Sequence, residues 1–298
     1  MNIIRNHAIH WLAFLIVSIW GTTFVSTKVL IHAGLSPSDI FFVRFVIAYI
    51  CIFPFSYKRL WADNLHDELL LLFAGVTGGS LYFLTENVAL QYSYCSNVSL
   101  LVCSTPMLTT LLLGLFYRGE RVNLKQFLCS FAALAGMALV VLNGHFVLKL
   151  SPRGDLLALA AACTWALYSL CMRMLGGRYP MVFVTRKIFF YGLLTILPVF
   201  FFHPLQTSPE LYSRPVVWGN LIFLGVVASF LCYFGWNIVL SRLGVVRSTN
   251  YIYLNPAVTL VTSHLVLGER VTLLALLGAF MIVGGIYFVE RYRTRKAV

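Results

Sequence analysis

Charged residues are scarce in this chain. Only 11% of its 298 residues are Asp, Glu, Lys or Arg, whereas 60% are hydrophobic, and the mean hydropathy is +0.85. A soluble globular protein of this length has no core large enough to hide that much apolar surface. The composition therefore predicts an all-α integral membrane protein whose solvent is the lipid bilayer.

Signatures of soluble catalysis and of cofactor binding are also absent from the sequence. The seven cysteines show no CxxC spacing, which argues against metal and disulfide sites. There is no P-loop, dinucleotide fingerprint, His-x-x-x-His or Gly-x-Ser-x-Gly motif, and loops are short throughout. We therefore expect neither an enzyme nor an ATP-driven pump in this chain, and no cofactor.

Long apolar runs take the place of such motifs. Ten stretches can each supply the roughly 20 helical residues that cross a hydrocarbon core. We expect these spans near residues 10–30, 39–55, 69–90, 97–116, 124–142, 156–173, 181–202, 218–240, 249–267 and 272–288.

The second half of the chain repeats the first. Pro106 is followed by Gly-Glu-Arg-Val at 119–122, and Pro256 by the same four residues at 268–271. At the offset of the two prolines, four further positions pair: Phe83, Asn87, Ala89 and Leu90 with Tyr233, Asn237, Val239 and Leu240. The repeat predicts two equivalent domains, 1–148 and 149–298. Each holds five spans, an odd number, so the two repeats are inverted in the membrane.

The basic residues indicate an orientation. If both termini are cytoplasmic, most of the 22 Lys and Arg residues fall in cytoplasmic segments, as the positive-inside rule requires. This asymmetry explains the formal net charge of +12, and without a basic patch interleaved with aromatics we expect no nucleic-acid partner. The first run has a repeat partner and no small-residue cleavage site, so it is expected to be a span rather than a signal peptide.

The order and spacing of short motifs resemble the EamA-type branch of the drug/metabolite transporter superfamily. The motifs are Trp20-Gly21-Thr22-Thr23-Phe24 with Lys28, then Arg44-Phe45, Ala89-Leu90, Ser96-Asn97, Pro106, Gly119-Glu120-Arg121 and Gly136. The resemblance implies a ten-helix carrier of inverted five-helix repeats around a central cavity, exporting amino acids or other small metabolites. The second half departs from the pattern, since Trp165 lacks the following glycine and Asn255 precedes its proline.

Glu86 is an acid well inside the third expected span. Burying an ionised carboxylate in hydrocarbon is costly, so we expect Glu86 to face the bundle interior or a wet cavity. Tyr82 lies one helical turn earlier on the same face, whereas the repeat partner of Glu86 is Trp236. The shared scaffold therefore does not require this acid. A role in proton coupling or substrate contact competes with a structural acid held neutral or paired with Arg44 or an amide.

Arg44 is the other charge inside a span, about five residues from the start of the second. Its guanidinium either snorkels to the headgroups or recognises a carboxylate or phosphate. Lys28 and Arg173, at helix ends, are expected to be snorkelling anchors.

Two prolines interrupt the fourth and ninth spans. Pro106 and Pro256 each remove a backbone hydrogen bond and free the carbonyl one turn earlier, on Val102 and Ile252. The polar residues beside them are expected to face the pore, the alternative being hydrogen bonds between helices. These residues are Thr105, Thr109, Tyr251, Asn255 and Thr259.

Two further pairs are related by the repeat. Asn87 and Asn237 either line the cavity or pin helices together. Trp20 and Trp165 either pack in the core or form aromatic walls, which would suit an aromatic or cationic solute.

The resulting hypothesis is a multi-pass carrier in the cell membrane, inner or plasma, that moves a small-molecule substrate by alternating access. Its energy would come from the solute gradient, exchange, or protons through Glu86. An organic-cation or drug carrier and a nucleotide-sugar-type carrier are alternatives, although the span interiors offer essentially only Arg44 to hold a phosphate. A channel or a membrane scaffold is the alternative from another class.

Overall fold

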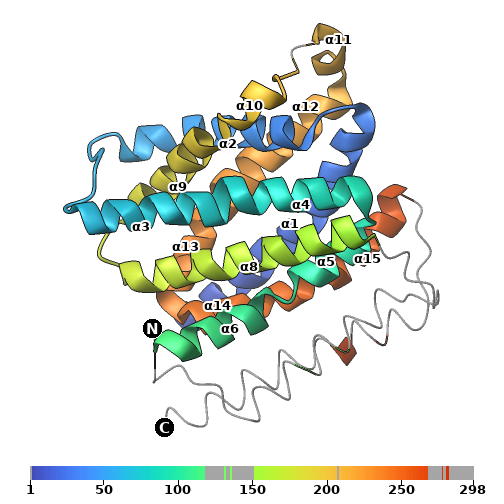
Figure 1. The fold of residues 1–298 in the computed structure, drawn as a ribbon. Helices are drawn as coiled ribbons and strands as arrows, with labels where there is room; N and C mark the ends of the chain where they lie inside the picture. Colours follow the sequence, from blue (N-terminus) through green and yellow to red (C-terminus); the bar gives the residue numbers. More distant parts are fainter. Residues whose placement is uncertain are drawn as a thin grey trace.

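The computed structural model describes residues 2–117, 131, 135, 151–206, 208–267, 277, 280 and 281. Every regular element in this part of the chain is a helix and none is a strand (Figure 1), which confirms the prediction of an all-α protein. The fifth and tenth expected spans lie outside the described residues apart from those isolated positions. Both Gly-Glu-Arg-Val sequences and Gly136 lie outside them entirely.

Helices of the first half cover four expected spans. The first two are α1 (Asn2–Ala33) and α2 (Pro37–Ser56). The third consists of α3 (Leu65–Gly75), η1 (Val76–Ser80) and α4 (Leu81–Tyr92), and the fourth of α5 (Cys95–Val102) and α6 (Thr105–Phe116).

Helices of the second half follow in a similar order. They are α8 (Pro152–Leu175), α9 (Met181–Ile196), the short α10 (Val199–Phe202) and α11 (Pro209–Tyr212), then α12 (Pro215–Ile222), η3 (Phe223–Leu231) and α13 (Cys232–Leu243), and finally α14 (Val245–Asn250), η4 (Tyr251–Leu254) and α15 (Asn255–Leu267).

Seven helical segments of the described residues are long and apolar enough to cross a membrane. They are Ala8–Ala33, Pro37–Ser56, Leu65–Tyr92, Cys95–Phe116, Pro152–Leu175, Met181–Phe202 and Pro215–Leu243. The ninth span, predicted as one helix near 249–267, is instead divided among α14, η4 and α15. The chain tightens into a 3₁₀ turn ahead of Pro256, whose nitrogen has no hydrogen to donate.

The interruptions of the helices recur at equivalent places in the two halves. The third and eighth spans each contain a π-helical segment, η1 and η3, and Gly78 in the first is the repeat partner of Ala228 in the second. The fourth and ninth spans both break just before their proline. A π turn and a proline both leave backbone carbonyls without their regular helical partners.

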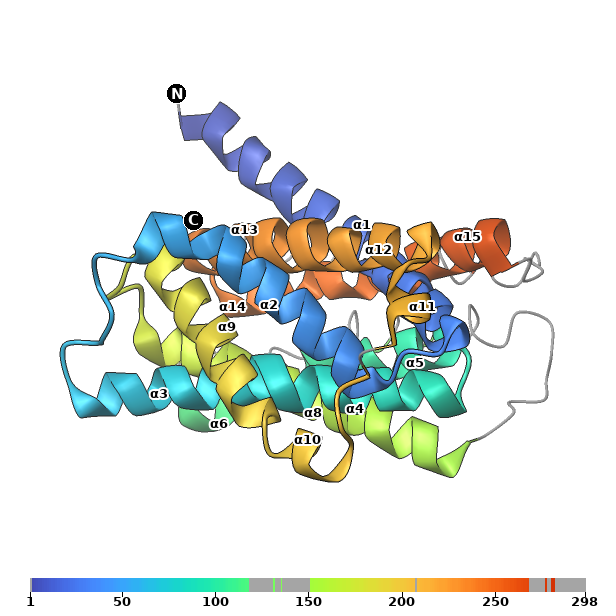
Figure 2. The ribbon, with the colours of Figure 1, turned by 90° about the horizontal axis from the view of Figure 1, so that it is seen from above.

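Contacts between the halves are reciprocal. Helix α8 packs against α4, α5 and α6, while α1 packs against α13, η4 and α15. Helices α2 and α9 contact each other, and each also contacts the π-helical segment of the opposite half. In Figure 2 these two helices run obliquely between the row of α3 and α4 and the row of α12 and α13. One large apolar core contains residues from both halves.

Local signals in the sequence explain where several helices begin and end. Ser36 caps α2 by accepting a hydrogen bond from the Asp39 amide at 3.2 Å, and Asn64 caps α3 through the Asp67 amide at 2.8 Å. Gly244, with a φ of +79°, makes the sharp turn from α13 into α14.

Gly78 permits a close approach between the two halves. A Cβ at this position would lie 2.5 Å from Cδ2 of Tyr168, inside the contact distance of two carbons. We predict that Gly78→Ala lowers the stability by about 1–3 kcal/mol, as overpacked cores do, measured as a lower midpoint of thermal unfolding in detergent.

Gly219→Ala is the matched control, because a Cβ there has no neighbour within 4 Å and alanine favours a helix over glycine. Its unfolding midpoint should be unchanged or slightly higher. Equal effects of the two substitutions would contradict the packing of Tyr168 against η1.

Candidate functional site

A central cavity of about 30 Å³ lies where the two halves meet. This volume accommodates one or two water molecules. Its lining comes from α1, α2, α4, α8 and the interrupted regions of the other helices: Trp20, Thr23, Phe24, Arg44, Tyr82, Phe83, Glu86, Val102, Thr105, Trp165, Tyr233, Ile252 and Asn255.

Seven of the ten residues predicted for a substrate or coupling site line this cavity. They are Trp20, Arg44, Tyr82, Glu86, Thr105, Trp165 and Asn255. The other three, Asn87, Asn237 and Tyr251, do not.

Glu86 lies in α4 with 3% of its surface exposed. The hydroxyl of Tyr82, one turn earlier, donates a hydrogen bond to Glu86 Oε2. The two side chains share one face of the helix, as their spacing predicts.

Arg44 is enclosed by the protein, and the snorkelling interpretation is wrong. Its side chain is 1% exposed, because α2 packs against both η3 and α4. Nε donates to Ser229 Oγ at 2.9 Å, and the guanidinium carbon lies 4.3 Å from the ring centroid of Phe83. Nη1 has no hydrogen-bond partner. Among the described residues, no carboxylate lies within ion-pair distance of this guanidinium.

Lys28 also differs from the prediction of a snorkelling anchor. Its Nζ donates to the backbone carbonyls of Leu90 and Ser93, the second at 3.1 Å. It therefore supplies donors to the last carbonyls of α4 rather than reaching for headgroups.

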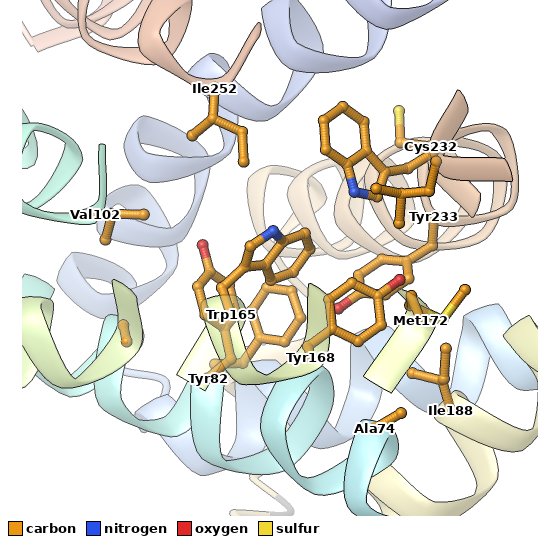
Figure 3. Packing of buried hydrophobic residues seen from close by; sticks show 14 of the residues in the cluster. Ala74, Tyr82, Val102, Trp165, Tyr168, Met172, Ile188, Cys232, Tyr233 and Ile252 are labelled. Atoms are coloured by element: carbon orange, nitrogen blue, oxygen red, sulfur yellow. The ribbon is translucent and has the colours of Figure 1, made fainter. Parts of the chain in front are cut away.

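Aromatic rings form one wall of the cavity. Trp165 lies 5.4 Å from Trp20, 4.7 Å from Tyr82 and 5.6 Å from Tyr233, measured between ring centroids. Figure 3 shows Tyr82 and Trp165 side by side, with Tyr168 and Tyr233 next to them.

Two of these aromatic side chains bond the carbonyls of the π-helical segments. Trp20 Nε1 donates to the Ala228 carbonyl at 3.0 Å, and the Tyr233 hydroxyl donates to the Gly78 carbonyl. The two carbonyls are equivalent by the repeat, and each donor comes from the opposite half. Trp165, the repeat partner of Trp20, is left with no partner for its Nε1.

The carbonyls freed by the prolines also find side-chain donors. The Thr105 hydroxyl donates to the Val102 carbonyl at 2.6 Å. The Ile252 carbonyl accepts from the Cys103 thiol at 3.1 Å and also from the Asn255 backbone amide of the 3₁₀ turn. Asn255 Oδ1 has no partner and its side chain lines the cavity.

The remaining polar residues beside the prolines divide between the two interpretations. Thr259 donates to the Gly21 carbonyl of α1 at 2.8 Å, so it joins helices. Tyr251 Oη lies 2.5 Å from Nδ1 of His10. Thr109 is buried and its hydroxyl has no partner, yet it is not part of the cavity lining.

The two predicted asparagines act as pins between helices. Asn87 donates to the Pro37 carbonyl at 3.2 Å. Asn237 accepts from the Tyr168 hydroxyl at 2.6 Å and donates to Thr185 Oγ1 at 2.7 Å.

Several lining residues were not among the predicted site residues. Tyr233 is the repeat partner of Phe83, and both line the cavity. Two features of the sequence could have identified Tyr233 as a lining residue: its pairing with Phe83 in the repeat and its position one helical turn before Asn237. Ser229, which holds Arg44, has no such signal because its role depends on how α2 packs against η3.

A second cavity, of about 320 Å³, lies between the ends of α8 and α13 and the start of α9. Arg173, Tyr179, Asn237 and Ser241 contribute to its lining. It is one helical turn or more from the central cavity along both α8 and α13.

A layer centred on Tyr168 separates the two cavities. Tyr168 is fully buried, and its ring lies 4.9 Å from Trp165 and 6.1 Å from Tyr233 on the central side. On the other side its hydroxyl bonds Asn237, which lines the second cavity.

An ion-pair network lies at the same end of the bundle, beside α3 and α9. Asp67 accepts from Arg178 Nη2 at 2.6 Å and from the Tyr179 hydroxyl at 2.7 Å, and Glu68 pairs with Lys187. Burial and the contact with Asp67 raise the pKa of Tyr179 above its ordinary value. The predicted orientation places this end of the bundle at the cytoplasmic face.

Comparisons with known proteins agree on one family. The model of the EamA-like transporter family matches residues 7–142 and again 152–291. A relative in Escherichia coli (strain K12), named "Probable amino-acid metabolite efflux pump", is 29% identical over 96% of each chain. One in Streptantibioticus cattleyicolor, named "Probable terminal-alkyne amino-acid exporter", is 28% identical over 94% of this chain and 93% of its own.

A solved crystal structure shares the fold. It aligns with a TM-score of 0.73 at 19% identity and covers 98% of both chains.

Substitution of Tyr233 tests whether its hydrogen bond to the Gly78 carbonyl of η1 stabilises the fold. We predict that Tyr233→Phe lowers the stability by about 1–3 kcal/mol, because the Gly78 carbonyl loses its donor in a buried site. The measurement is the midpoint of thermal unfolding in detergent. Tyr92→Phe, at an exposed position on α4, is the control and should leave the midpoint unchanged. A Tyr233→Phe midpoint equal to that of the control would show that the bond does not stabilise the fold.

Proposed function

The chain belongs to the EamA-like transporter family, and from that premise we propose that it exports amino acids or similar small metabolites across the cell membrane by alternating access. That it is a small-molecule transporter follows from the family and from its relatives. The finer proposal rests on the central cavity, where both halves place buried polar side chains and the first half adds two charged ones, Arg44 and Glu86.

The proposed architecture is ten spans arranged as two inverted repeats, residues 1–148 and 149–298. The π-helical segments and the breaks before the prolines, which recur at equivalent positions, support the repeat. The reciprocal contacts between the halves support a twofold relation between them, and the odd number of spans expected in each half supports their inversion. The distribution of Lys and Arg supports cytoplasmic termini.

Alternating access accounts for the size of the central cavity. A space of about 30 Å³ holds water but not an amino acid, so the site must widen to bind one. A carrier must widen this cavity toward one face at a time. The second cavity, separated from the site by the Tyr168 layer, is the proposed path toward the cytoplasm.

Glu86 is the proposed coupling residue. It is the acid in the lining of the central cavity, and an intramembrane acid that faces a cavity is a candidate proton carrier. The hydrogen bond that it accepts from the Tyr82 hydroxyl would weaken on protonation, because a neutral carboxyl group is a poorer acceptor than a carboxylate.

Counterflow into proteoliposomes tests the function. We expect saturable exchange of at least one of the twenty proteinogenic L-amino acids, with a rate that depends on an imposed pH gradient. Glu86→Gln should abolish that dependence, because the amide cannot bind a proton in its place. No exchange of any solute in a panel that adds small metabolites would overturn the proposed function. A pH dependence that survives Glu86→Gln would remove only the coupling role.

Tyr168→Phe tests the barrier toward the second cavity. The phenylalanine keeps the ring but loses the bond to Asn237, so the barrier should open more often. We predict faster amide hydrogen exchange, measured by mass spectrometry, in residues 168–176 and 237–244. Ser241→Ala is the control, since Ser241 lines the same cavity but bonds only its own helix, at Ile238. Unchanged exchange in Tyr168→Phe would exclude this bond as part of a gate.

A further inference from the structure

The lining of the central cavity includes one positively charged and one negatively charged side chain. Arg44 and Glu86 are the charged residues of its lining, and no ion pair joins them in the described part of the chain. Arg44 is held by Ser229 and the Phe83 ring instead, and Glu86 by Tyr82. The site therefore presents two separate charges of opposite sign.

Three polar atoms of the cavity lining lack hydrogen-bond partners. They are Nη1 of Arg44, Nε1 of Trp165 and Oδ1 of Asn255, on side chains that are 1%, 4% and 4% exposed. A buried polar atom without a partner costs free energy. All three atoms belong to residues that line one cavity, and these two donors and one acceptor point to a ligand that supplies the missing partners.

We propose that the site binds an α-amino acid as a zwitterion with a neutral side chain. The inference rests on the proposed function and assigns the two ends of the solute. The carboxylate accepts hydrogen bonds from Arg44 Nη1 and Trp165 Nε1. The ammonium group lies between the carboxylate of Glu86 and Oδ1 of Asn255, against the faces of the aromatic wall.

Charge balance distinguishes this solute from other classes. While Glu86 is ionised, a phosphate-bearing or other anionic solute would satisfy Arg44 but place a second negative charge beside that carboxylate. An organic cation would satisfy Glu86 but leave the guanidinium of Arg44 unpaired. In a site of low dielectric either mismatch is costly. A zwitterion satisfies both charges at once.

The other residues of the lining determine which side chain the bound amino acid can carry. Phe24, Val102 and Ile252 are apolar and complete the wall beside the rings. A third charge on the solute would find no partner there, because Arg44 and Glu86 already hold the backbone charges. The site therefore selects neutral amino acids, and apolar side chains best match its walls.

The test compares solutes that differ by one charged group. Counterflow with the full chain in liposomes is measured for L-leucine and L-phenylalanine, for the amines 3-methylbutylamine and phenethylamine, and for the acids 4-methylpentanoate and 3-phenylpropanoate. We expect at least one amino acid to be exchanged, with its amine and its acid competing at least about tenfold more weakly, since a hydrogen bond to a charged group contributes about that much.

Substitutions in the lining then show which residues bind the carboxylate and which bind the ammonium group of the solute. Trp165→Phe and Arg44→Gln should each reduce the preference for the amino acid over its amine by about tenfold, whereas Glu86→Gln should reduce its preference over the deaminated acid. Trp165→Phe keeps the ring and tests the carboxylate end even if Arg44→Gln does not fold. Trp236→Phe is the control, because Trp236 also has an unpartnered Nε1 but does not line the cavity. It should leave both preferences unchanged.

The outcomes separate this inference from the proposed function. An amine or an acid exchanged as well as the amino acid overturns the zwitterion site while leaving a small-molecule carrier in place. Exchange of amino acids with charged side chains but not of these two overturns the selection for neutral ones. A panel in which no solute at all is exchanged counts against the proposed function itself. Trp165→Phe and Trp236→Phe with equal effects would remove Trp165 from the carboxylate end.

Discussion

A helix that is interrupted inside a membrane must give each freed carbonyl another donor, because lipid supplies none. This constraint shapes the centre of the protein. Trp20 and Tyr233 bond equivalent carbonyls of the two π-helical segments, each across the boundary between the halves. The donors that complete the backbone thus also form the wall of the central cavity. The interruptions and the site are consequences of the same packing.

The hydrogen bonds to the backbone also determine which polar side chains remain available to bind a solute. Thr105 and Cys103 are occupied by the carbonyls freed near the prolines, and Asn237 is occupied by Tyr168 and Thr185. The guanidinium of Arg44, the indole of Trp165 and the amide of Asn255 retain free positions. Polar residues that all lie inside apolar spans therefore have different roles: some bond other parts of the protein, and others remain available to a solute.

Composition, apolar runs and helical spacing were sufficient to predict the helical membrane class, seven spans and the pairing of Tyr82 with Glu86. The repeat directed attention to Trp20, Trp165 and Asn255. Other features depend on contacts between distant helices, which no local pattern encodes. The burial of Arg44 follows from α2 packing against η3 and α4, and the role of Asn87 as a pin follows from its contact with Pro37. The split of the ninth span follows from a 3₁₀ turn that hydropathy cannot distinguish from a continuous helix.

We propose that one cavity between the two halves becomes accessible to each face of the membrane in turn. The direct measurement places a single cysteine at Ile252, an apolar residue of the lining, in a chain whose seven native cysteines are replaced by serine. Serine keeps a donor at position 103 for the Ile252 carbonyl. A membrane-impermeant methanethiosulfonate is then applied to each face of oriented proteoliposomes. We expect modification from both faces, slowed in each case by a saturating transported solute. Modification from one face only, or from neither, would contradict it.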